Sequence, residues 1–142
     1  MCLAVPGKIV KIENVKSKQV FVVHGRDLQS RDELVLLLKQ EFELEPIVLM
    51  DKSNQSKTVI EKFEKNTLNV GYAFVILTPD DIGYLNEKSQ KPKPRARENV
   101  LLELGYFIGK LGRDNVCCIR KGDPLLPSDL HGIVDIPFKE VG

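Results

Sequence analysis

The sequence predicts an α/β domain in which a parallel sheet of five strands carries helices on both faces. From residue 19 onward, apolar β-rich runs alternate with helical patterns, which is typical of a parallel sheet covered by helices. The run YAFVILT at residues 72–78 is apolar throughout, as expected of a strand buried on both faces. With 142 residues, the chain has the length of one domain and can bury a core.

The predicted elements follow one another in a regular order along the chain. QVFVVH at residues 19–24 is the first expected strand, and residues 28–43 form the first expected helix. Further strands are predicted at 46–50, 72–78, 115–120 and 132–138, and further helices at 57–66 and 96–112. The strand order expected for this doubly wound pattern is 2-1-3-4-5.

One connection is unusually long. Residues 78–95 join the third strand to its helix, and so long a segment in a compact α/β domain is usually a functional lid or a disordered segment. Pro92 and Pro94, which stand among lysines, favour mobility. The sequence therefore predicts a mobile segment here.

Composition excludes several classes of function. Lys and Arg number 21 against 20 Asp and Glu, a formal charge of +1, so no electrostatic footprint for nucleic acid or a membrane surface is present. Three cysteines without zinc-type spacing suit a reducing cytosol, and the adjacent Cys117 and Cys118 should point to opposite faces of a strand. Apolar runs are too short to span a bilayer, and the N-terminus lacks a signal peptide. We expect a soluble, cytoplasmic protein.

Polar residues gather at the predicted crevice of the sheet. In doubly wound sheets, ligands bind outside the carboxyl ends of the strands where strand order reverses, here between the first and third strands. The first strand runs into HGRD at residues 24–27, where Gly25 would let a ligand approach the backbone and Arg26 could pair with an anion. The third runs into TPDD at 78–81. Alternatively, Asp27 caps the next helix, and Asp80 or Asp81 hydrogen-bonds its own backbone.

The helix within RARENVLLELGYFIGKLGR, residues 95–113, carries an unexpected carboxylate. Its apolar residues recur at helical spacing and should face the core, namely Val100, Leu104, Phe107, Ile108 and Leu111. Glu103 falls on another face together with Asn99, Tyr106 and Lys110. This face is either exposed to solvent, with Glu103 near Lys110, or it lines the predicted crevice.

A polar stretch, DKSNQSKTVIEKFE, follows the second strand at residues 51–64. Ser56 or Thr58 can cap the following helix, and Thr58 with Glu61 fits a capping box. The stretch lacks the glycine spacing of a phosphate loop, although Lys57 near the helix start could still help to bind an anion.

The first twelve residues, MCLAVPGKIVKI, resemble the N-terminus of hydrogenase-maturation chaperones of the HypC/HupF type, in which Cys2 would be the working thiol. The resemblance stops at Ile12. Alternatively, KIVKI forms an extra edge strand or a hairpin partner across the turn ENVKSK, or the stretch is a remnant of a gene fusion. We therefore divide the chain into an N-terminal extension, residues 1–18, and a main domain, residues 19–142.

Five stretches of the main domain resemble a known family in order and spacing: VFVVHGRD, NQSKTVIEKFE, YAFVILTPDDIG, RARENVLLELGYFIGKLGR and PSDLHGIV. They are similar to prokaryotic TIR-like nucleotide-binding proteins, the TIR domain of bacterial cyclic-nucleotide-gated defence effectors, over residues 19–138. The resemblance implies a flavodoxin-like TIR fold and, in active members, cleavage of NAD+ between nicotinamide and ribose. Glu103 corresponds to the catalytic glutamate, and its helix is also similar to that of nucleoside deoxyribosyltransferases.

Cleavage of an N-glycosidic bond gives a physical reason for one carboxylate. Oxocarbenium charge develops on the ribose, and a carboxylate beside the sugar stabilises it, attacks it or orients water. The catalytic residue is therefore predicted to be Glu103, with NAD+ as substrate and no cofactor. The predicted substrate-binding residues are His24, Gly25, Arg26, Asp27, Lys57, Thr78, Asp80, Asp81, Arg95, Arg97, Asn99 and Tyr106.

Two functions fit the sequence. The first is a TIR-type NAD+ nucleosidase in antiviral defence or cell-suicide signalling, and the second is a non-catalytic TIR module that binds a nucleotide or another TIR domain. A metallochaperone stands behind both, because it rests on twelve residues. Partners expected for the first are NAD+, other TIR domains through self-association, and an upstream sensor domain or protein. Relative to the family, Ser56 stands in place of a glycine and Glu98 in place of a glutamine.

Overall fold

The computed structural model describes residues 2–5, 8–12, 17–49, 58–88, 90–130 and 135–137, with the backbone alone for the first two ranges and the last. Its strands are β1 (Cys2–Val5), β2 (Lys8–Ile12), β3 (Gln19–Val23), β4 (Glu45–Ile47), β5 (Tyr72–Leu77), β6 (Asp81–Gly83), β7 (Lys93–Arg95), β8 (Val116–Arg120) and β9 (Asp135–Pro137). Its α-helices are α1 (Leu28–Gln40), α2 (Val59–Asn66) and α3 (Glu98–Leu111), and short 3-10 turns lie at Arg113–Asn115 and Ser128–Leu130.

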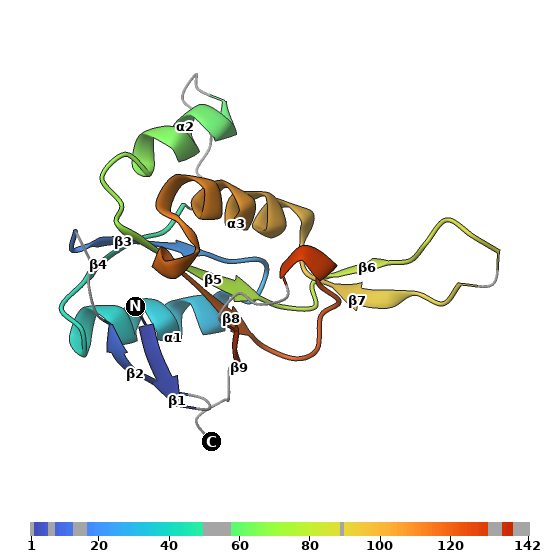
Figure 1. Ribbon diagram of the computed structural model, residues 1–142, viewed down its shortest axis with the longest axis horizontal. Coiled ribbons are helices and arrows are strands. Elements are labelled where there is room, and N and C mark those ends of the chain that lie inside the picture. The colour runs from blue at the N-terminus through green and yellow to red at the C-terminus, as the bar shows by residue number, and fades with distance from the viewer. Residues whose placement is uncertain are drawn as a thin grey trace.

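A parallel sheet forms the middle layer of the domain. Its strands lie in the order β4-β3-β5-β8-β9, and every neighbouring pair is parallel. Helix α1 covers one face, and α2 and α3 cover the other (Figure 1). The predicted α/β class with a parallel sheet is confirmed.

Strand residues alternate between the two faces of the sheet. On β3, Val20 and Val22 pack with α1, whereas Phe21 and Val23 pack with α2 and α3. Cys117 and Cys118 of β8 divide in the same way, as the sequence predicted. The central strands therefore contribute side chains to the hydrophobic cores on both faces of the sheet. This packing fixes the positions of the carboxyl ends of β3 and β5 relative to each other.

Side-chain caps start two of the helices. Asp27 is the N-cap of α1 and accepts a hydrogen bond from the backbone N–H of Ser30, and Thr58 with Glu61 forms the predicted capping box of α2. Helix α1 ends at Gln40, three residues before the predicted end at residue 43. Glu43 has a positive φ of 54°, so the chain turns there toward β4 in place of a further helical turn.

The long connection after β5 differs from the prediction. Residues 81–83 and 93–95 pair as an antiparallel ribbon, β6 with β7, that projects from the domain (Figure 1). The backbone N–H of Leu125 donates a hydrogen bond to the carbonyl of Pro94 and ties the base of the ribbon to the main domain. Proline is tolerated in such a strand because a two-stranded ribbon leaves an edge unpaired. The two ends of the segment that was expected to be mobile are thus paired as a β-ribbon.

The N-terminal strands form a sheet of their own. β1 pairs with β2 in an antiparallel sheet of two strands that is separate from the five-stranded sheet. The alternative in which KIVKI is an edge strand, or pairs across ENVKSK, is therefore wrong. The sequence Pro-Gly between the two strands is a turn signal that favours the observed pairing.

Among the described residues, no helix is both long enough and apolar enough to cross a bilayer.

Candidate functional site

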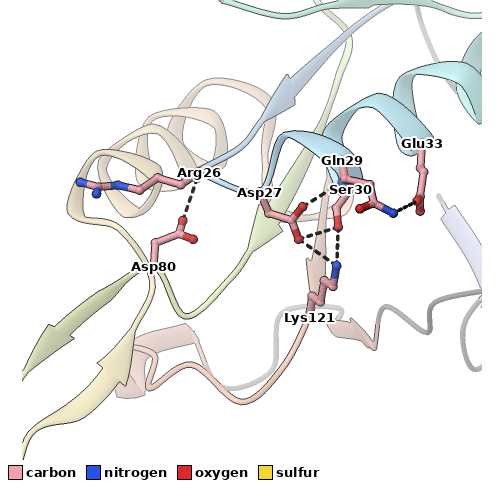
Figure 2. A network of polar contacts seen from close by, with 7 residues as sticks. All are labelled: Arg26, Asp27, Gln29, Ser30, Glu33, Asp80 and Lys121. Atoms are coloured by element: carbon pink, nitrogen blue, oxygen red, sulfur yellow. Dashed lines mark hydrogen bonds and ion pairs between the residues drawn. The ribbon is translucent and has the colours of Figure 1, made fainter.

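Two polar turns meet where β3 and β5 end. The backbone N–H of Arg26 donates a hydrogen bond to Oδ2 of Asp80, at 3.0 Å (Figure 2). Gly25 permits this contact, because a Cβ atom built there would lie 1.8 Å from the same carboxylate oxygen. Any side chain at this position would displace Asp80. The predicted convergence of HGRD and TPDD is observed at these residues.

Thr78 lies beneath these turns. Its residue is 4% exposed, and its hydroxyl oxygen has no hydrogen-bond partner among the described residues. The same oxygen would be 3.5 Å from a Cβ at Gly25. Asp80 does not hydrogen-bond its own backbone with its side chain, since its carboxylate reaches Arg26 instead. Asp81 lies in β6, opposite Arg95.

Asp27 is held in a polar network on the α1 side of the sheet. Its carboxylate accepts hydrogen bonds from the backbone and hydroxyl of Ser30, at 3.0 and 2.7 Å, and from Nζ of Lys121 at 2.9 Å (Figure 2). Burial alone would raise the pKa of Asp27, but the hydrogen bonds from Ser30 and Lys121 outweigh it and lower the pKa to about 2. The carboxylate is therefore ionised and engaged within the protein.

His24 follows β3 and is half-buried. Its Nδ1 lies 2.8 Å from the carbonyl oxygen of Gly25 and donates to it. Burial lowers the pKa of His24, with a further contribution from the charge of Arg31, and backbone hydrogen bonds at Gly25 and Leu49 oppose the change. The imidazole is therefore neutral at physiological pH.

Glu103 lies in the second turn of α3 and is half-buried. Burial raises its pKa to about 7, and the positive charge of Arg97 opposes this change. Among the described residues, no hydrogen bond or ion pair reaches its carboxylate. A poorly solvated carboxylate without a close partner is unusual on a simple wet helix face and is typical of functional sites.

One reading of the sequence placed Lys110 near Glu103, but the structure places its ammonium on Thr67 instead. Its ammonium donates hydrogen bonds to the carbonyl and the hydroxyl of Thr67 and lies 5.7 Å from the centre of the Tyr106 ring. The hydroxyl of Tyr106 lies 3.1 Å from that of Thr67. Both side chains thus connect α3 to the end of α2.

Three further predicted site residues lie on α3, on the ribbon and in the turn after β3. Asn99 is exposed in the first turn of α3. Arg95 lies against Gly83 in the ribbon, since a Cβ at Gly83 would be 2.7 Å from the Arg95 side chain, and its Nε is buried without a partner among the described residues. Arg26 is exposed. Lys57 lies outside the described residues.

Sequence reasoning missed three residues that organise the site: Ser30, Thr67 and Lys121. Lys121 directly follows β8, so the rule that carboxyl ends of parallel strands meet at one edge would have placed it near Asp27. Thr67 follows α2 and has no such sequence signal.

The fold and this edge of the sheet define a doubly wound α/β domain in which polar turns meet at the switch point and the next helix carries a poorly solvated glutamate, Glu103. Residues 19–140 match the family model described as "CAP12/Pycsar effector protein, TIR domain". The chain belongs to this family of TIR domains, as the sequence resemblance predicted.

Similar proteins cover most of this chain. The Escherichia coli K12 protein YuaY is 43% identical over 126 residues, which are 89% of this chain and 42% of YuaY. Protein tirC of Dictyostelium discoideum is 37% identical over 86% of this chain and 65% of its own length. The Pycsar effector protein PaPycTIR of Pseudomonas aeruginosa is 35% identical over 59% of this chain and 27% of its own length. The chain thus spans less than two thirds of each relative.

Proposed function

We propose that this TIR domain is an NAD+ nucleosidase that cleaves the bond between nicotinamide and ribose, with Glu103 as its catalytic residue. The observation that carries the proposal is the half-buried carboxylate of Glu103. Its burial raises the pKa of Glu103 to about 7. Family membership supports it, because the helix stretch that carries Glu103 lies within the matched residues.

The chemistry requires little more than this carboxylate. As the bond from C1′ of the ribose to the nicotinamide nitrogen breaks, its electron pair goes to the ring, and nicotinamide leaves as a neutral molecule without a general acid. Positive charge then develops on the ribose, and the ionised Glu103 stabilises it. Water adds to C1′ and releases a proton. Poor solvation strengthens the interaction, because less water screens the two charges.

Other predicted residues are assigned to substrate binding in this proposal. Arg97 is the cation whose charge acts on Glu103, and Arg26 is exposed in the turn that meets Asp80, so both suit the pyrophosphate. Asp80 uses Oδ2 for Arg26, and its second oxygen suits a ribose hydroxyl. Asp27 and Tyr106 are engaged within the protein and are better suited to holding the site together.

The cellular role proposed is cytoplasmic defence signalling. Relatives are named Pycsar effector protein and CD-NTase-associated protein 12, which supports an upstream nucleotide-responsive sensor and assembly of TIR domains. A requirement for assembly predicts that nicotinamide release per mole of protein rises with protein concentration, together with particle size. Constant specific activity from dilute monomer upward would contradict it.

Incubation of concentrated protein with NAD+, followed by measurement of free nicotinamide, tests the proposal. Wild type is expected to release nicotinamide and Glu103→Gln to release none, because the amide cannot carry the negative charge. Glu98→Gln, an exposed position on the same helix, is the matched control. NAD+ binding without nicotinamide release in the wild type would instead support the non-catalytic module.

A further inference from the structure

Helix α3, which carries Glu103, is joined to the end of α2 by three polar side chains. Thr67 directly follows α2 and is fully buried, at 0% exposure. Its hydroxyl lies 2.9 Å from the carbonyl of Glu64 and 3.1 Å from the hydroxyl of Tyr106. Nζ of Lys110 reaches both the hydroxyl, at 3.3 Å, and the carbonyl of Thr67.

The hydrogen-bonding capacity of Thr67 fixes the direction of each contact. A hydroxyl has one proton and two lone pairs, and the proton of Thr67 goes to the carbonyl of Glu64, which can only accept. Tyr106 must therefore donate to Thr67, as Lys110 also does. All three positions of the buried hydroxyl are filled, so loss of any partner leaves a position unsatisfied.

Aromatic packing surrounds this cluster and limits how α3 can rotate. Phe63 of α2 meets the Tyr106 ring edge to face, with centroids 4.9 Å apart. Phe63 also packs against Phe107, at 5.6 Å. Because each residue turns an α-helix by about 100°, side chains that fix residues 106, 107 and 110 also fix the direction of residue 103.

We propose that Tyr106, Lys110 and Thr67 form a clamp that positions Glu103, by holding α3 at one rotation against α2 and by keeping the Lys110 ammonium on Thr67. Glu103, Tyr106 and Lys110 are spaced i, i+3 and i+7, so they share one side of the helix. Tyr106, Lys110 and Thr67 are positioning residues, and the inference rests on the proposed function only for its effect on catalysis.

Two variants open the clamp from different elements. Thr67→Val keeps the side-chain shape and removes the buried hydroxyl, whereas Lys110→Met keeps an unbranched side chain at an exposed position and removes the ammonium. Asn66→Ala is the control, because Asn66 is the neighbour of Thr67 and its side-chain amide donates to the carbonyl of Lys62 within α2.

The first measurement is the titration of Glu103 by carbon-13 NMR of its carboxyl group, which needs no catalysis. In wild type the pKa is expected at about 7. In Thr67→Val it should fall toward the ordinary glutamate value, since the Tyr106 hydroxyl loses its partner, α3 loosens and water reaches the carboxylate. In Lys110→Met it should also fall, because the second contact between α3 and Thr67 is lost, and Asn66→Ala should match wild type.

The second measurement is nicotinamide release. Both clamp variants should lose about tenfold or more in kcat with little change in KM, because the carboxylate is misplaced while the binding groups stay. Clamp variants that titrate like Asn66→Ala would overturn the positioning role and leave Tyr106, Lys110 and Thr67 as packing alone. A shifted titration in a protein whose wild type releases no nicotinamide would support the clamp and reject the proposed function.

Discussion

The backbone N–H of Arg26 and the carboxylate of Asp80 are joined by a 3.0 Å hydrogen bond across the ends of two neighbouring parallel strands. It links the turn after β3 to the turn after β5. The contact depends on Gly25, whose missing side chain leaves room for the carboxylate. One peptide group and one side chain thus relate two turns that lie 54 residues apart in the sequence.

Substitution of Gly25 by alanine should break this contact. The new Cβ would lie 1.8 Å from Oδ2 of Asp80, so the carboxylate must move and the N–H of Arg26 loses its acceptor. We expect a loss of about 1–3 kcal/mol in the free energy of unfolding, measured by urea denaturation. The control is Gly109→Ala in α3, where, apart from the adjacent backbone of the helix itself, no atom of the described residues lies within 4 Å of the new Cβ, and stability should rise by about 0.5–1 kcal/mol. Equal effects at the two glycines would contradict the close packing at Gly25.

The pH dependence of NAD+ cleavage should report Glu103. Its pKa of about 7 is raised by burial against the opposing charge of Arg97, and the ionised form is the active one. We expect kcat/KM to rise about tenfold per pH unit below 7 and to level off above it. In the complex, the cationic nicotinamide ring favours the carboxylate, so the rise in kcat should lie at lower pH. Initial rates across pH 5–9 measure both profiles, and a kcat/KM that does not change between pH 6 and 8 would remove Glu103 from the catalytic role.

The parts of the structure that follow from local chemistry were predictable from sequence. The cap at Asp27 and the capping box of Thr58 and Glu61 were both anticipated, because each depends on residues within one helical turn. Convergence of Gly25 and Asp80 followed from a topological rule for parallel sheets.

Long-range partners of polar side chains were less predictable. Lys110 could reach Glu103 along its own helix, and sequence spacing alone does not show that Thr67, 43 residues away, binds it instead. The ribbon of β6 and β7 was also missed, because its lysines and prolines are typical of mobile segments while the backbone pairing that orders it leaves no clear side-chain pattern.

The Asp27 network should contribute stability that is lost in acid. The folded pKa of Asp27, about 2, is lower than the model-peptide value of 3.8, so its contribution is present above pH 3.8 and is lost as pH falls through about 2. Asp27→Asn should cost about 2 kcal/mol at pH 7, because it weakens the helix cap and the ion pair with Lys121, and the difference from wild type should shrink toward pH 2. Asp32→Asn is the control, because it breaks an ion pair with Arg31 on the same helix at an exposed carboxylate. A difference that stays constant down to pH 2 would contradict the assignment.

Glu103→Gln should change stability in the opposite sense. The folded pKa of Glu103, about 7, is higher than its unfolded value near 4.5, so between these pH values the folded protein keeps a proton that the unfolded chain has lost. The contribution of the protonated carboxyl is complete below pH 4.5 and is lost as pH rises through 7. Glutamine imitates the neutral acid and cannot ionise.

The variant should therefore gain on wild type as pH rises. We expect the difference in free energy of unfolding to grow by about 1 kcal/mol between pH 5 and pH 8, after allowance for the water that still screens this partly buried carboxylate. Urea denaturation at these two pH values measures it, with Glu98→Gln as the exposed control on the same helix. A Glu103→Gln variant that unfolds at both pH values would show that the carboxylate is a structural partner in a buried network. A gain in stability at pH 8 together with loss of nicotinamide release would mean that the wild-type protein is less stable because it keeps a charge where the reaction needs it.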